Sequence, residues 1–241
     1  MEIRGLGFFP LLWITWTLLG LGTLVALTVI SGHEKYPYIS DTGKELPESA
    51  VYTTVFMVAS ILGAGLTYIQ YRFMIIQSQP SEKRYIICQR ILLAMGWIAC
   101  IGTAVSAAYS LKTNPTAHRI GAGVAFLCNA FFNVCQAVRL YKRSFGSRRM
   151  CHLRLAFASV TCLILVIFAF TQTFFYFHLC SDQCLKIVYA FGISSEYLGF
   201  SALTLHQLTN WTDFQRLSLK LSREGVSICL REKIQDPENP A

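Results

Sequence analysis

The sequence LGFFPLLWITWTLLGLGTLVALTVISG, residues 6–32, decides the class of this protein. It contains no Asp, Glu, Lys or Arg, and it exceeds the roughly 20 apolar residues that cross a bilayer. A cleaved signal peptide is the alternative. Its apolar region would have only about 7–15 residues and would end at a small-x-small cleavage site, which is absent here. We therefore expect a retained transmembrane helix.

The composition extends this conclusion to the whole chain. Of its 241 residues, 54% are hydrophobic and 14% are charged, whereas a soluble domain has about 25% charged residues. Each apolar run must be a helix, because lipid offers no partners to backbone N–H and C=O groups. The predicted spans are residues 6–30, 50–71, 91–111, 120–138, 155–177 and 187–208. The predicted fold is an all-α integral membrane protein: a six-transmembrane-helix bundle over residues 1–208 with short loops, and a tail over residues 209–241.

Basic residues predict the orientation of this bundle. With six spans, most Lys and Arg residues fall on the side that holds both termini. The exceptions are Lys35, Lys44, Lys112, Arg119 and Lys186. Basic loops stay cytoplasmic, so both termini are predicted in the cytoplasm and loop 33–49 on the lumenal or extracellular side. We expect the basic face to attract anionic membrane lipid. Nucleic acid is a poor candidate partner, because the charge is divided among short loops.

The tail contains a second pattern, RLSLKLSREGVSICL, residues 216–230. Apolar and polar residues alternate on both sides of Ser-Arg-Glu-Gly, which favours a hairpin with one apolar face. An amphipathic helix on the membrane surface is the competing interpretation. An isolated two-stranded hairpin is marginal in water, so either form is expected to rest on lipid or on the bundle.

Glu196 is the main candidate for a functional side chain within the membrane, where ionisable groups are costly and usually functional. It shares a helical stripe with glycines, which predicts a close neighbouring helix. We expect that neighbour to be the fourth span, whose polar stripe recurs at helical spacing. The candidate polar core of the bundle consists of Glu196, His118, Asn129, Asn133 and Gln136. A structural interhelical bond, a ligand or proton site, and catalysis all remain open for Glu196.

The sequence has no nucleophile elbow, phosphate loop or HExxH motif, and we assign no catalytic, cofactor-binding or metal-binding residue. Cys180 and Cys184 are the two cysteines predicted outside the membrane on the non-cytoplasmic side, where disulfides persist. Their spacing makes a local disulfide feasible. Two free thiols, or a metal site that includes His178 and Asp182, are the alternatives.

Four short segments resemble one family. The first is PYISDTGKELPES, residues 37–49; the others are AHRIGAGVAF at 117–126, CHLRLAFASV at 151–160, and Glu196 followed by Asp213-Phe214. Together they resemble the Frag/DRAM/Sfk family, and the first segment is most similar to the damage-regulated autophagy modulator branch. That branch has two prolines where this chain has Leu46-Pro47. The segment HQLTNWTDF, residues 206–214, is similar to the branch that remodels glycosylphosphatidylinositol anchors.

The resemblance implies a non-enzymatic multi-pass protein that modulates autophagy at lysosomal or other endomembranes, with membrane lipids and unidentified proteins as partners. A first alternative is a lipid-handling factor in anchor remodelling at the Golgi or in phosphoinositide homeostasis at the plasma membrane. A second alternative is a proton-coupled transporter that uses Glu196, although paired broken helices are lacking.

The first outer loop carries the candidate motif of the family-like segment. Its residues are Pro37, Tyr38, Ser40, Asp41, Thr42 and Gly43. Proline and glycine bracket a turn in which the three short polar side chains can bond the backbone. We predict that the loop folds over the outer mouth of the bundle as a fixed lid. An ordinary solvated connector is the alternative.

Overall fold

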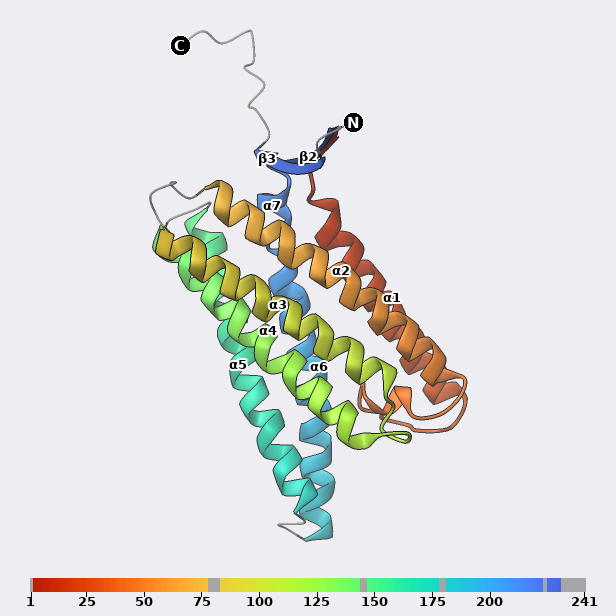
Figure 1. The fold of residues 1–241 in the computed structure, drawn as a ribbon. Coiled ribbons are helices and arrows are strands. Elements are labelled where there is room, and N and C mark those ends of the chain that lie inside the picture. Colours follow the sequence, from red (N-terminus) through yellow and green to blue (C-terminus); the bar gives the residue numbers. More distant parts are fainter. Residues whose placement is uncertain (1, 78–82, 144–146, 178–180, 223–224, 231–241) are drawn as a thin grey trace, which may run out of the picture.

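Six long helices form a bundle with a small sheet at one end in the computed structural model of the chain (Figure 1). The structure describes residues 2–77, 83–143, 147–177, 181–222 and 225–230. The long helices are α1 (Phe8–Ile30), α2 (Glu48–Ile76), α3 (Lys83–Ala108), α4 (Pro115–Arg143), α5 (Arg148–Tyr176) and α6 (Asp182–Leu208). The predicted all-helical fold class is confirmed.

Five of these helices, α1 to α5, are long and apolar enough to cross a membrane. The sixth, α6, has a similar length and packs along α5, but Glu196 and several Ser and Tyr residues lower its hydropathy. Large apolar side chains cover the outside of the bundle; Ile30, for example, is 82% exposed and Val166 is 67% exposed. Together with the length of the helices, such a surface is typical of a protein that faces lipid.

Most helices extend beyond the spans predicted from hydropathy. The largest difference is in α3, which begins at Lys83 rather than at residue 91. A helix can continue past the hydrocarbon layer, because its backbone bonds are internal and its charged side chains reach water. Hydropathy therefore marks only the part of each helix that lies in lipid.

The connection between α3 and α4 shows why a helix ends early. Ser110 and Thr113 each accept a hydrogen bond from the other's backbone N–H, both at 3.1 Å. This turn ends α3 at Ala108 instead of residue 111. The Asn114 side chain then accepts a bond from the backbone N–H of Ala117 at 3.0 Å and caps α4, which begins at a proline as many helices do.

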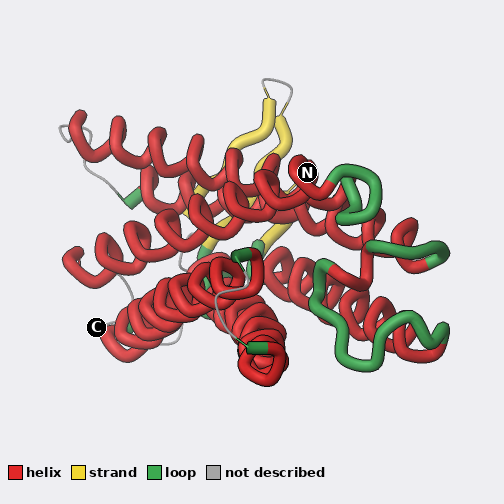
Figure 2. The backbone as a smooth tube through the Cα atoms, turned by 90° about the horizontal axis from the view of Figure 1, so that it is seen from below, coloured by secondary structure: helices red, strands yellow, loops and turns green. Residues whose placement is uncertain are grey.

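Successive helices lie side by side, and α1 also contacts α6 (Figures 1 and 2). The closest approach is between α3 and α4. A Cβ atom at Gly102 would lie 2.7 Å from the backbone of α4, and one at Gly121 would lie 2.7 Å from the backbone of α3. Small residues at both positions allow the two backbones to meet.

The end of the bundle that holds the N-terminus and the sheet is called the terminal end below (Figure 1). The predicted hairpin is confirmed as β2 (Leu217–Ser222) and β3 (Gly225–Leu230), paired antiparallel. The alternative of an amphipathic helix is wrong. A third strand that the sequence did not predict, β1 (Glu2–Arg4), pairs with the free edge of β2, so the sheet order is β1-β2-β3.

This sheet rests on the bundle through an apolar cluster. Leu217 and Ile228, from the two strands of the hairpin, are buried against Phe73 of α2 and Leu140 of α4. Phe214, from the short helix α7 (Trp211–Phe214), belongs to the same cluster. Because a free hairpin is marginal, this burial accounts for the order of residues 217–222 and 225–230.

Candidate functional site

The loop between α1 and α2, residues 33–47, folds back onto the opposite end of the bundle and is called the lid below. A single 3-10 turn, η1 (Asp41–Gly43), lies at its centre. Of the six predicted motif residues, five are buried and Ser40 is partly buried. The structure therefore places residues 37–43 against the bundle, whereas residues 33–36, Lys44, Leu46 and Pro47 are exposed.

Short polar side chains fix the turn within the lid. The Asp41 carboxylate accepts a bond from the backbone N–H of Tyr38 at 3.3 Å. The Thr42 hydroxyl donates to the backbone carbonyl of Ile39 at 2.6 Å. Such local bonds between side chain and backbone are the reason that Asp and Thr favour turns. The sequence therefore predisposes the loop to the shape in which it docks.

Glu196 of α6 holds the lid to the bundle. Its side chain is 7% exposed, and its Oε2 accepts a hydrogen bond from the backbone N–H of Ile39 at 2.7 Å. A buried carboxyl group is unfavourable without hydrogen-bond donors, and the backbone N–H of Ile39 supplies one. The contact joins the family-like loop motif to the acidic residue of the last long helix.

Three tyrosines extend this contact along α6 and the lid. The Tyr38 hydroxyl donates to the Tyr189 carbonyl at 3.2 Å, and the Tyr189 hydroxyl donates to Asp41 at 3.4 Å. The Tyr197 hydroxyl donates to the Pro37 carbonyl at 3.2 Å. Burial raises the pKa of Tyr38 to about 12, so its hydroxyl stays protonated as a donor at neutral pH.

Two glycines make room for aromatic rings in this interface. A Cβ atom at Gly192 would collide with the Tyr38 hydroxyl, and one at Gly43 would lie 2.8 Å from the Tyr52 ring. The Tyr38 and Tyr189 rings meet edge to face with centroids 5.0 Å apart, a favourable arrangement for aromatic pairs. The lid therefore fits closely against both α6 and α2.

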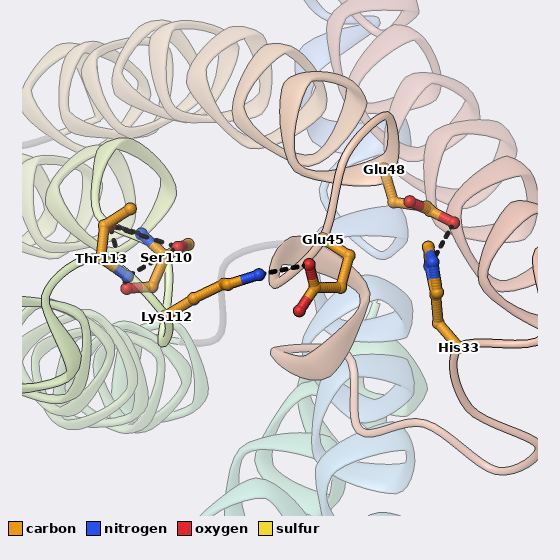
Figure 3. A network of polar contacts seen from close by, with 6 residues as sticks. All are labelled: His33, Glu45, Glu48, Ser110, Lys112 and Thr113. Carbon is orange, nitrogen blue, oxygen red and sulfur yellow. Dashed lines mark hydrogen bonds and ion pairs between the residues drawn. The ribbon is translucent and has the colours of Figure 1, made fainter.

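An ion pair and a histidine–carboxyl contact flank the lid (Figure 3). Lys112, in the connection between α3 and α4, lies 2.6 Å from Glu45 of the lid. His33 Nδ1 lies 3.1 Å from Oε1 of Glu48, the first residue of α2. Lys112 and Glu45 are both well exposed, so we expect little stabilisation from that pair. Glu48 is buried, and its contact with His33 links the loop after α1 to the start of α2.

The predicted polar stripe of α4 contacts α3 and not Glu196. His118 Nδ1 lies 2.8 Å from the Ser106 carbonyl and 2.9 Å from the Tyr109 carbonyl. Gln136 Nε2 donates to Gln89 of α3 at 3.2 Å.

Within α4 itself, Asn133 Nδ2 donates to Asn129 at 3.1 Å. The expectation that the fourth span is the main neighbour of Glu196 is therefore wrong. The reason is packing, because α6 lies mainly against α5 while α4 lies against α3.

A buried ion pair at the terminal end was not found from the sequence. Arg154 of α5 is 1% exposed, and its Nη1 lies 2.7 Å from Oδ2 of the buried Asp213 in α7. Its Nε and Nη2 donate to the hydroxyl and the carbonyl of Thr209, at 3.0 and 2.6 Å. The sequence did contain an indication of this pair, because Arg154 and Asp213 both lie in segments that carry the family resemblance.

The outer cysteines stay a prediction. Cys180 lies outside the described residues, and Cys184 lies in the first turn of α6, so the structure does not test a bond between them. His178, proposed with them as a metal ligand, also lies outside the described residues. Within the described part of the chain, no group of three or more His, Cys, Asp or Glu side chains is placed to hold a metal ion.

The space beside Glu196 limits what this carboxylate can do. A cavity of about 20 Å³ lies between α4, α5 and α6, lined by Glu196, Ser195, Thr161 and apolar side chains such as Phe126. This volume suits about one water molecule. The arrangement can hold the lid, and the cavity beside the carboxyl group is smaller than an organic substrate.

Three curated proteins illustrate what the chain resembles. DNA damage-regulated autophagy modulator protein 1 of Mus musculus is 28% identical over 92% of this chain and 96% of its own length. The Homo sapiens protein of that name is 27% identical with the same coverage. DNA damage-regulated autophagy modulator protein 2 of Mus musculus is 28% identical over 58% of this chain and 52% of its own length. No solved structure gives a significant match.

The family comparison covers most of the fold described above. The model described as the Frag1/DRAM/Sfk1/Cwh43P N-terminal domain matches residues 5–217. That range contains the lid, the long helices, Glu196 and the Arg154–Asp213 pair. The chain therefore belongs to the Frag1/DRAM/Sfk1/Cwh43P N-terminal domain family.

Proposed function

We propose that this multi-pass membrane protein modulates autophagy without catalysing a reaction. The observation that carries the proposal is the extent of the match to the mouse and human autophagy modulators, which covers 92% of this chain and 96% of each relative. These relatives are named as modulators and not as enzymes. The small cavity beside Glu196 and the backbone donor that occupies its carboxylate favour a structural role for that residue.

The proposed location is a lysosomal or other endomembrane, with both chain ends in the cytosol. Basic side chains support this orientation. Arg72, Arg84, Arg139 and Arg149 all belong to helix ends at the terminal end of the bundle, and such residues favour the cytoplasmic side. The lid then faces the lumen. In this arrangement the modulator acts through contacts of a fixed lumenal surface and a basic cytosolic surface.

Cells that lack the protein provide the main test. We expect autophagic flux, measured as turnover of a lipidated autophagosome marker with and without lysosomal inhibition, to change in knockout cells and to return with the wild-type chain. Rescue with Glu196→Leu is expected to fail because the lid is released. Ser194→Ala is the matched control, because Ser194 is an exposed neighbour whose hydroxyl donates to the Ala190 carbonyl of the same helix.

Antibody access to tagged chain ends tests the proposed location and orientation. A tag at either end should be reached by antibodies once the plasma membrane alone is opened, with the organelle membranes still intact, and should lie on lysosomal or related membranes. Unchanged flux, combined with a Golgi location and altered surface display of anchored proteins, would contradict the proposal and favour a role in anchor-lipid remodelling.

A further inference from the structure

The start of α3 and the end of α4 lie side by side at the terminal end (Figure 1). Side chains from these two helices line a basic hollow. Its volume is about 250 Å³, and it is lined by Arg84, Tyr85, Cys88, Arg139 and Lys142. Three of these five side chains are cationic and none is acidic. Tyr85 also packs against the apolar cluster beneath the sheet.

The Arg139 guanidinium is held in place and has a hydrogen-bond donor available for a ligand. Its guanidinium lies over the Tyr85 ring, 5.8 Å from the centroid, which orients its plane. Its Nη1 is shielded from solvent and has no hydrogen-bond partner among the described residues. A shielded donor without an acceptor is costly. An acceptor oxygen from a ligand would remove that cost.

The set of donors selects phosphate. A guanidinium offers planar paired donors to phosphate oxygens, and an ammonium adds a point charge. Arg139 and Lys142 are three residues apart on α4, so they occupy one helical face, and Arg84 approaches from α3. Three cations exceed the single charge of a phosphodiester and fit the nearly double charge of a phosphomonoester.

The surroundings favour a lipid as the source of this phosphate. Arg84, Ile87, Cys88 and Ile91 recur along α3 at the spacing of one helical face. Ile87 is 56% exposed and Ile91 is 55% exposed. A head group in the hollow would therefore place its acyl chains on these apolar side chains. Basic pockets between transmembrane helices are known to take lipid head groups.

We propose that the basic hollow binds the phosphomonoester head group of a membrane lipid, with Arg139 and Lys142 as its main ligands and Arg84 at its edge. This inference is independent of the role in autophagy. It requires only that the protein sits in a membrane that contains such a lipid.

The test uses the full-length protein in mixed micelles with fluorescent phosphatidic acid, a lipid with a phosphomonoester head group. Competing ligands are phosphatidylserine, phosphatidylcholine and inorganic phosphate. We expect phosphatidic acid to bind at least fivefold more tightly than phosphatidylserine, and inorganic phosphate to compete only weakly because it lacks acyl chains. Equal binding of the two anionic lipids, or inorganic phosphate binding as tightly as the lipid, would overturn the proposal.

Matched variants separate this site from diffuse charge. Arg139→Gln is expected to weaken phosphatidic acid binding about tenfold, and Lys142→Gln about fivefold. Arg148→Gln and Arg149→Gln remove the same charge from exposed positions at the same end of the bundle and should change binding less than twofold. Lys142 is also exposed, so its variant tests the site even if Arg139→Gln fails to fold. If the two variants in the hollow and the two control variants weakened phosphatidic acid binding equally, a defined site would be refuted.

Discussion

The Glu196 carboxylate accepts a hydrogen bond from the backbone N–H of Ile39, which lies 157 residues earlier in the chain. This bond joins the last long helix to the first loop and closes the lid end of the bundle. The donor is a backbone N–H group, which every residue except proline has, so the sequence does not indicate which residue makes this bond. The acidic residue of α6 and the turn motif of the lid therefore form one structural unit.

Releasing this bond should open the lid. Glu196→Leu removes the acceptor and leaves the Ile39 N–H buried without a partner, at a cost of about 1–3 kcal/mol. We expect trypsin to cut the detergent-solubilised variant after Lys35 and Lys44 roughly tenfold faster than the wild type. Mass spectrometry of the fragments measures both sites. Glu196→Gln keeps an acceptor oxygen and should fall between the two, while Ser194→Ala should match the wild type.

The fit between Gly192 and Tyr38 gives a second prediction. Gly192→Ala places a Cβ atom in collision with the Tyr38 hydroxyl, and overpacking of this kind costs about 1–3 kcal/mol. We expect a lower midpoint of thermal unfolding and faster cleavage in the lid. Nothing lies within 4 Å of a Cβ atom at Gly123 of α4, so Gly123→Ala is the matched control and should be neutral or stabilising. Equal behaviour of the two variants would contradict close packing at Gly192.

The helices and the hairpin were predictable because their signals are local. The uncharged run of residues 6–32 and the alternation of Leu217, Leu219 and Leu221 each lie within a short window. Strand β1 was missed because only three residues form it, and its pairing with residues 218–220 is set by where α1 and α7 bring the chain. Helix ends were misplaced where charged residues continue the helix beyond lipid.

The partner of Glu196 could not be inferred in the same way. The sequence shows a polar stripe on α4 and an acidic residue on α6, and both face the interior. Which helices touch depends on packing over the whole bundle, and the paired glycines Gly102 and Gly121 bring α4 against α3. The polar residues of α4 are then bonded within that pair, so Glu196 is left for the lid.

The buried ion pair at the terminal end supports a third prediction. Removing either partner leaves the other charge buried without compensation, which costs about 3–5 kcal/mol. We expect Arg154→Met and Asp213→Leu each to lower the midpoint of thermal unfolding strongly. The double variant should be more stable than the sum of the two losses predicts, because the two side chains interact directly. Additive losses would show that the pair contributes no coupling energy.

The exposed pair between Lys112 and Glu45 should matter far less. Their side chains are 62% and 43% exposed, and pairs of this kind contribute about 0.2–1 kcal/mol. Lys112→Ala is expected to change the midpoint of thermal unfolding very little and to leave lid cleavage nearly unchanged. A large effect, especially one that persists in high salt, would show that the connection between α3 and α4 holds the lid in place.

His206 lies near the end of α6. Most substitutions of buried residues destabilise a fold, but replacement of His206 is expected not to. It is 1% exposed, and among the described residues neither of its ring nitrogens has a hydrogen-bond partner. Because a buried polar group without a partner destabilises the fold, His206→Leu should leave the midpoint of thermal unfolding unchanged or raise it. His152→Leu, at an exposed position of α5 where the ring meets Tyr141 edge to face, is the histidine control and should lower the midpoint slightly. A variant of His206 that stays folded yet fails to restore autophagic flux would instead show that the imidazole serves a partner absent from the free chain.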